Sequence, residues 1–155
     1  MRRSNLGRAL LLLAAAVVSA PGLAAQTDNP RFGVWQLQSD APPPAINIMT
    51  YEPYGDGGMK ITVESKNAEG RESKWGYVTM FDGVFRPVTG LENSETAVEI
   101  VDERTTRILN KRNGEVNQII INVLSTDGNT INNEYRRKNE DGSERVTHAV
   151  YKRIG

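Results

Sequence analysis

The sequence lacks cysteine entirely and has one histidine, His148, among its 155 residues. Without cysteine there are no disulfides, no thiol chemistry and no lipid-modified N-terminal cysteine. A single histidine cannot supply the two or three imidazoles of a usual zinc site, so we expect no metal and no cofactor. A Ser-His-Asp arrangement would have one possible base, and no other nucleophile or cofactor motif stands out. The residue types therefore favour a binding protein over an enzyme.

The chain also lacks an excess of charge, with 19 Lys and Arg side chains against 19 Asp and Glu. Nucleic-acid-binding surfaces depend on clustered positive charge, so we expect no nucleic-acid partner. The short basic run Arg136-Arg137-Lys138 is followed within eight residues by three carboxylates, Glu140, Asp141 and Glu144.

Only one long apolar run is present, at residues 9–18. It follows three arginines and precedes a cluster of small residues, an order typical of a secretory signal peptide. The run is shorter than the roughly 20 residues that a membrane-spanning helix needs, although an uncleaved anchor helix is the alternative. We expect residues 1–25 to be removed near Ala24 or Ala25. Residues 26–155 then form a single domain that is periplasmic or secreted and does not span a membrane.

The mature chain lacks a capped apolar stripe with the helical period. Instead, glycines preceded by Asp, Asn or Glu recur at positions 57, 70, 83, 114, 128 and 142. Such pairs fit tight hairpin turns, because glycine readily adopts a positive φ. The intervals of 13 or 14 residues leave arms of about nine or ten residues each, which predicts a meander of long strands.

Between these turns, apolar and polar residues alternate as they do in half-buried strands. We expect strands near 33–38, 45–53, 59–66, 71–81, 84–88, 95–102, 105–112, 115–125, 130–138 and 143–153. The predicted fold class is all-β, an up-and-down antiparallel barrel of about 8 to 10 strands, because closing the sheet removes its edges. A two-sheet β-sandwich is the alternative, although only the connection at residues 90–95 could form the long crossover that it needs.

Short motifs along nearly the whole mature chain carry a family resemblance. They are Gly33-Val34-Trp35, Tyr51-Glu52-Pro53, Phe81-Asp82-Gly83, Pro87-Val88-Thr89-Gly90, Asp127-Gly128-Asn129-Thr130 and Val150-Tyr151. In this order they resemble the lipocalin-like, or calycin, β-barrels, and more closely a group of small exported bacterial barrels without an assigned activity. The resemblance implies that Trp35 closes one end of the barrel beneath an arginine from a late strand. The Pro-rich stretch 41–44 leaves no room for the helical lid of fatty-acid-binding proteins.

The last two hairpins predict a candidate binding wall. If Asp141-Gly142 is a two-residue turn, Tyr135 lies opposite His148. A two-residue turn at residues 127–128 likewise places Ile120 opposite Tyr135. One inward face then carries an apolar surface with a few polar tips, which is how ligand sites are built. The predicted ligand-binding residues on this face are Ile120, Asn133, Tyr135, His148 and Val150. A slip of one residue in either hairpin would turn its side chains to the other face.

A second face is predicted from Trp75 and Tyr77, which point the same way along one strand. Such an aromatic patch is typical of an apolar ligand cavity, although a filled core has the same pattern. The sequence therefore predicts a soluble exported barrel that binds a small, partly apolar molecule in its interior.

Several alternatives remain at the level of sequence. One is a filled-core envelope protein or protein-binding module without a small-molecule ligand. Others are a barrel isomerase or cyclase that uses Tyr135 or His148, and a haem-binding barrel with His148 as its one axial ligand. An outer-membrane barrel would need an apolar face on every strand, and the segment 105–112 carries basic residues on both faces.

Overall fold

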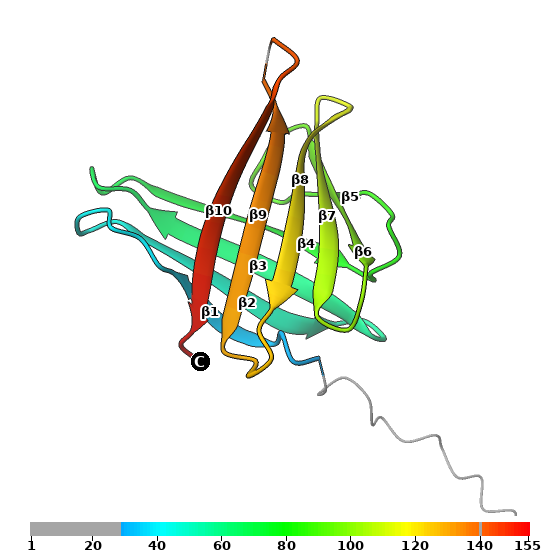
Figure 1. Ribbon diagram of the computed structural model, residues 1–155, viewed down its shortest axis with the longest axis horizontal. Coiled ribbons are helices and arrows are strands. Elements are labelled where there is room, and N and C mark those ends of the chain that lie inside the picture. Colours follow the sequence, from blue (N-terminus) through cyan, green and yellow to red (C-terminus); the bar gives the residue numbers. More distant parts are fainter. Residues whose placement is uncertain (1–28, 140) are drawn as a thin grey trace, which may run out of the picture.

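The computed structural model describes residues 29–139 and 141–155, and these residues form a ten-stranded antiparallel barrel (Figure 1). The predicted signal peptide, residues 1–25, lies outside the described residues. The strands are β1 (Gly33–Leu37), β2 (Ile46–Tyr54), β3 (Gly58–Lys66), β4 (Glu72–Thr79), β5 (Arg86–Pro87), β6 (Ser94–Ile100), β7 (Thr105–Arg112), β8 (Glu115–Leu124), β9 (Thr130–Lys138) and β10 (Glu144–Arg153).

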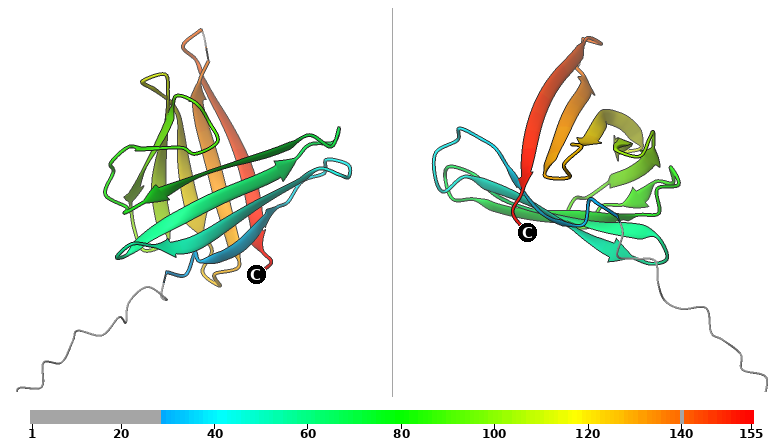
Figure 2. Two further views of the ribbon diagram at one scale, coloured as in Figure 1. Left: turned by 180° about the vertical axis from the view of Figure 1, so that it is seen from behind. Right: turned by 60° about the horizontal axis from the view of Figure 1, so that its bottom comes forward.

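The strands pair in the order β4-β3-β2-β1-β10-β9-β8-β7-β6-β5, so the first and last strands are neighbours. Every other pairing joins consecutive strands, as an up-and-down meander requires. Strands β6 to β10 stand side by side, and β2 to β4 cross them from the opposite side of the interior (Figure 2). The predicted all-β barrel is thus confirmed. Consecutive pairing leaves no Greek-key crossover for the alternative sandwich.

The barrel closes at a short seam between β4 and the segment after β5. The Gly76 N–H donates to the Thr89 carbonyl at 3.0 Å, and the Thr89 N–H donates back to the Gly76 carbonyl at 2.8 Å. A side chain at position 76 would have its Cβ 2.5 Å from the Ile61 carbonyl oxygen. Glycine therefore allows three backbone segments to approach closely at this point.

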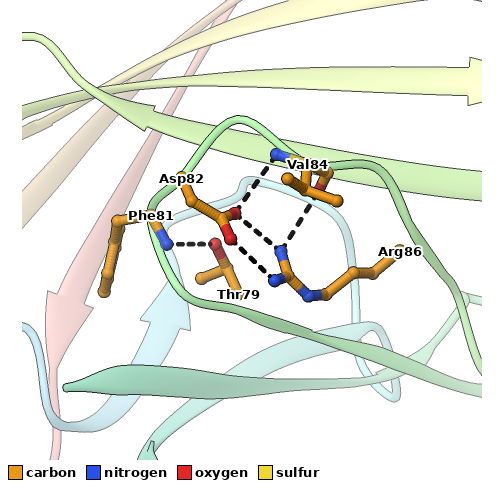
Figure 3. A network of polar contacts seen from close by, with 5 residues as sticks. All are labelled: Thr79, Phe81, Asp82, Val84 and Arg86. Carbon is orange, nitrogen blue, oxygen red and sulfur yellow. Dashed lines mark hydrogen bonds and ion pairs between the residues drawn. The ribbon is translucent and has the colours of Figure 1, made fainter. Parts of the chain in front are cut away.

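The turn between β4 and the seam is braced by side-chain contacts (Figure 3). The Asp82 carboxylate accepts two hydrogen bonds from the Arg86 guanidinium, at 2.7 and 2.8 Å, and one from the Val84 N–H at 3.2 Å. The Phe81 N–H donates to the Thr79 hydroxyl at 2.9 Å. These contacts hold the chain where it leaves the sheet and turns towards β5.

One end of the barrel, here called the base, is closed by Trp35 and Arg153. The Trp35 side chain is 0% exposed, and the Arg153 guanidinium lies 4.2 Å from the centre of its ring. Arg153 also donates to the carbonyls of Pro30, Phe32 and Gly128. A guanidinium over an indole ring is favourable. Here it also ties the segment before β1 and the β8–β9 turn to the last strand. The arginine above Trp35 that the resemblance implied is therefore present.

The described residues contain no helix that is long and apolar enough to cross a membrane. The segment between β1 and β2 is an extended turn without a helix. The core inside the barrel draws on both groups of strands, with Ile61 and Val63 from β3 and Ile120 and Ile131 from β8 and β9.

Candidate functional site

The register of β6 to β10 arranges their inward side chains in transverse rows. The row nearest the open end, here called the mouth row, is polar and consists of Thr96, Asn110, Gln118, Arg137 and Arg145. The next row is largely apolar and consists of Val98, Ile108, Ile120, Tyr135 and Thr147. The third row, nearer the base, contains Thr106, Asn122, Asn133 and Ala149. An apolar row between two polar rows is typical of a site for a molecule with both kinds of surface.

A pocket of about 270 Å³ lies where the first two rows meet the solvent. It is lined by Gln118, Tyr135, Arg137, Arg145 and Thr147. This mouth pocket combines two guanidinium groups, an amide, a phenol and a hydroxyl. It can therefore offer several hydrogen-bond donors to one small group.

Arg137 and Arg145 are direct partners across the β9–β10 ladder, so two positive charges face each other in the mouth pocket. The ion pairs among the described residues engage other arginines, namely Arg86, Arg107 and Arg136. Like charges in directly opposed positions are unfavourable. The mouth pocket therefore holds two cations without a carboxylate within 4 Å among residues 29–139 and 141–155.

The amide of Gln118 is the neighbour of Arg137. A guanidinium can only donate hydrogen bonds, so the amide oxygen must face it. In that orientation the oxygen lies 2.7 Å from Arg137 Nε and 2.9 Å from Nη2. The side-chain amides of Gln118 and Asn110 lie 2.9 Å apart at their nearest atoms. The Thr96 hydroxyl oxygen lies 2.8 Å from the Asn110 amide. Arg137 is thus held in place by neutral groups, which do not compensate its positive charge.

Behind the mouth pocket runs a buried chain of hydrogen bonds, here called the amide relay. Arg31, which is 4% exposed, donates through Nε to Asn122 Oδ1 at 3.2 Å. Asn122 Nδ2 donates to Asn133 Oδ1 at 2.8 Å, and Asn133 Nδ2 donates to the Tyr135 hydroxyl oxygen at 3.1 Å. The relay thus connects the base of the barrel to the mouth pocket.

The interior around the relay keeps its phenols neutral. Burial raises the pKa of Tyr51, Tyr77 and Tyr151 well above the ordinary value. Desolvation also lowers the pKa of the Arg31 guanidinium, while the nearby Tyr51 and Asp102 oppose that shift. Since an arginine starts far above neutral pH, Arg31 remains a cation and a donor.

Trp75 and Tyr77 lie on the inner face of β4, as their spacing predicted, and their rings stack with centroids 6.3 Å apart. They face the barrel from the wall opposite β8 to β10, where Tyr77 is buried and Trp75 half-buried. Neither lines the mouth pocket. An open groove of about 650 Å³ lies on the outer side of the same strands, between the Lys60–Glu52 and Lys74–Glu64 ion pairs. Trp75 and Tyr77 are among the residues that line this outer groove.

The predicted pairing of Tyr135 with His148 is wrong. Thr147 lies opposite Tyr135, and His148 lies opposite Glu134. The His148 side chain is 69% exposed and its Nε2 lies 3.4 Å from a Glu134 carboxylate oxygen. His148 and Val150 therefore sit on the outer face, because alternate residues of a strand point to opposite sides.

The predicted pairing is wrong because the turn between β9 and β10 has a different centre from the one assumed. Lys138 pairs with Glu144, and the Asn139 N–H donates to the Ser143 carbonyl at 2.8 Å, so the turn is centred on Asp141. A two-residue turn would be centred between Asp141 and Gly142. This half-residue displacement shifts the register by one and exchanges the two faces of β10.

The β8–β9 hairpin was predicted correctly. Ile120 lies opposite Tyr135, and Asn122 lies opposite Asn133. Ile120 and Asn133 are buried, and Tyr135 is half-buried at the mouth pocket. The structure thus brings Ile120, Asn133 and Tyr135 together and separates them from His148 and Val150.

Gln118, Arg145 and Thr147 were not predicted as site residues. Period two from Ile120 leads directly to Gln118. The inward position of Arg145 and Thr147 depends on the register of β10, for which the sequence contains one clue. Asn67 and Asn139 each stand three residues before a hairpin glycine. Both asparagine N–H groups donate to the carbonyl four residues later. Comparison of the two hairpins would have given the register of β10.

No group of three or more His, Cys, Asp or Glu side chains that could hold a metal ion occurs among the described residues.

Comparison with solved structures supports the fold. The chain is similar to the fluorescent protein UnaG, with a TM-score of 0.54 and 11% sequence identity over 79% of this chain and 96% of that one. A point mutant of UnaG, with alanine in place of one asparagine, matches with a TM-score of 0.56 and 11% identity, over 81% of this chain and 97% of the other. No family model and no curated protein matches the sequence. At this identity the likeness shows a shared β-barrel fold.

Proposed function

We propose that this protein is an exported barrel that binds a small, partly apolar molecule at the mouth pocket. The observation that carries the proposal is the pocket itself, in which Arg137 and Arg145 converge above an apolar row. The polar end of the molecule contacts the arginines, Gln118 and Tyr135. Its apolar part lies against Ile120 and the inner wall of the barrel.

A filled-core module that binds another protein is the second candidate, and one observation favours it. The mouth pocket of about 270 Å³ is slightly smaller than ligand pockets usually are, since these span about 300 to 1,000 Å³. Beneath it, Trp35, Ile61 and Ile131 are fully buried. A haem held in the interior by His148 is not compatible with the outward position of that residue.

Native mass spectrometry of the protein purified from its own organism tests the small-molecule proposal. The variant Thr147→Trp places an indole in the mouth pocket, and Val146→Trp places the same indole on the outer face of β10 as a matched control. We expect one small molecule to co-purify with the wild type and with Val146→Trp, but not with Thr147→Trp. A wild-type protein that carries no small molecule would favour the filled-core module.

Export is part of the proposal, supported by the basic, apolar and small-residue order of residues 1–25. N-terminal sequencing of the protein from a periplasmic or extracellular fraction tests it. We expect the chain to begin at Ala25 or Gln26. A chain that begins at Met1 would contradict export through this segment.

A further inference from the structure

The amide relay has a fixed direction, which its first member sets. Arg31 has only N–H donors, so Asn122 must present its oxygen to Arg31 and its nitrogen to Asn133. Asn133 in turn accepts from Asn122 and must donate onward, to the Tyr135 hydroxyl oxygen. A buried amide turned the other way would place two donors against each other, which is costly.

The relay therefore ends with the Tyr135 oxygen as an acceptor. Tyr151 lies beside it, and the pKa of Tyr151 is raised by burial first and then by Tyr135, through charge and a hydrogen bond. The Tyr135 oxygen thus accepts the Asn133 amide proton from the interior side, which leaves its own proton for an acceptor in the mouth pocket that Tyr135 lines.

We infer that Tyr135 is a specificity-determining donor, and that the amide relay from Arg31 makes the mouth pocket select an anionic hydrogen-bond acceptor such as a carboxylate. The inference rests on the proposed function and names the chemical class of its ligand. Arg137 and Arg145 supply positive charge at the same pocket, and an oxygen anion would relieve their mutual repulsion. A ligand with an ammonium group would meet two cations and a hydroxyl already committed as a donor.

The test compares three probes that share one apolar skeleton. They are 2-naphthylacetate, its methyl ester, and 2-(2-naphthyl)ethylamine, titrated against the full-length mature protein by naphthalene fluorescence. The acid is an anionic acceptor, the ester is a neutral acceptor, and the amine is a cationic donor. We expect the acid to bind at least tenfold more tightly than the amine, with the ester between them.

Tyr135→Phe isolates the hydroxyl, with Tyr54→Phe, at the exposed end of β2 and outside the mouth pocket, as a matched control. One hydrogen bond to a charged group corresponds to roughly a tenfold change in affinity, and one to a neutral group to somewhat less. We expect Tyr135→Phe to weaken the acid by about tenfold and the ester by a few-fold, and to leave the amine within twofold. Tyr54→Phe should leave all three within twofold.

Asn133→Asp tests the direction of the relay. An aspartate at this position accepts the Tyr135 proton and turns it away from the pocket, although the hydroxyl remains. We expect the neutral ester to weaken as much as in Tyr135→Phe, and the acid to weaken further because the new carboxylate repels it. Without a role of the relay, the uncharged ester would keep its wild-type affinity. If this variant does not fold, as judged by circular dichroism, Tyr135→Phe still decides the inference.

The outcomes separate the two proposals. Binding of the amine as tightly as the acid, or equal effects of Tyr135→Phe on all three probes, overturns the selectivity and leaves small-molecule binding intact. Failure of every probe to bind the wild type overturns both.

Discussion

Arg137 on β9 and Arg145 on β10 face each other across the ladder on the inner side of the barrel, at its open end. A protein selected for stability alone would place opposite charges at such a pair, because like charges there are unfavourable. Functional sites often keep an arrangement that costs stability. The pair is therefore the feature of this barrel that most clearly indicates a ligand.

Replacing one arginine should stabilise the empty protein. We expect Arg145→Gln to raise the free energy of unfolding by about 0.2 to 1 kcal/mol at low ionic strength. The gain should shrink in 0.5 M salt, because salt screens exposed charges. Urea unfolding at both salt concentrations measures it. A loss of stability at low salt would show that Arg145 has a stabilising partner.

Arg153 should matter far more for folding, because it covers Trp35 and donates to three loop carbonyls. We expect Arg153→Met to lower the free energy of unfolding by about 2 to 4 kcal/mol, since the carbonyls lose their donors. Lys152→Met, the neighbouring exposed residue, is the control and should change it by about 0.5 kcal/mol or less. Denaturant unfolding followed by tryptophan fluorescence provides the measurement. Equal effects of the two substitutions would contradict a structural role for the Arg153 contacts.

The Asp82–Arg86 pair predicts a pH-dependent contribution to stability. The Arg86 guanidinium is the main cause that holds the pKa of the Asp82 carboxyl well below its usual range. The folded state therefore binds fewer protons than the unfolded state, so this contribution is present above about pH 4 and is lost as the pH falls further. We expect Asp82→Asn to lower the melting temperature at pH 7.

The difference between Asp82→Asn and the wild type should narrow steadily below about pH 4. Asp56→Asn, in the turn between β2 and β3, is a control for the loss of one surface charge. A melting-temperature difference that stays constant from pH 7 to pH 3 would show that ionisation of Asp82 is not the cause.

The outward position of His148 predicts that it has no part in ligand binding. We expect His148→Ala to change the affinity for 2-naphthylacetate by less than twofold. Added haem should give the same absorbance spectrum with the wild type and with this variant. A Soret shift that depends on His148 would require a site on the outer face, beside Glu134.

Much of the fold follows from sequence, because turn glycines and alternation report local geometry. The predicted strand at 130–138 has the same limits as β9, and the strand at 143–153 differs from β10 by one residue. The β8–β9 register was also predictable, since the turn of residues 127–128 is centred where a two-residue turn would be.

The site was predictable only in part, because register is sensitive to half a residue at the turn. The hairpin centred on Asp141 moved Arg145 and Thr147 inward and His148 outward. The amide relay depends on contacts between Arg31 and Asn122, which are 91 residues apart in the chain. No local pattern reports such a contact, because it arises only when the barrel closes.

The most direct test of the proposed ligand site is a two-dimensional ¹H–¹⁵N NMR titration of the mature protein with 2-naphthylacetate. We expect the largest shift changes on the amides of Gln118, Tyr135, Arg137, Arg145 and Thr147, which line the mouth pocket. Largest changes at Thr62, Gly76 and Thr89 would place the probe in the outer groove and contradict binding at the mouth pocket.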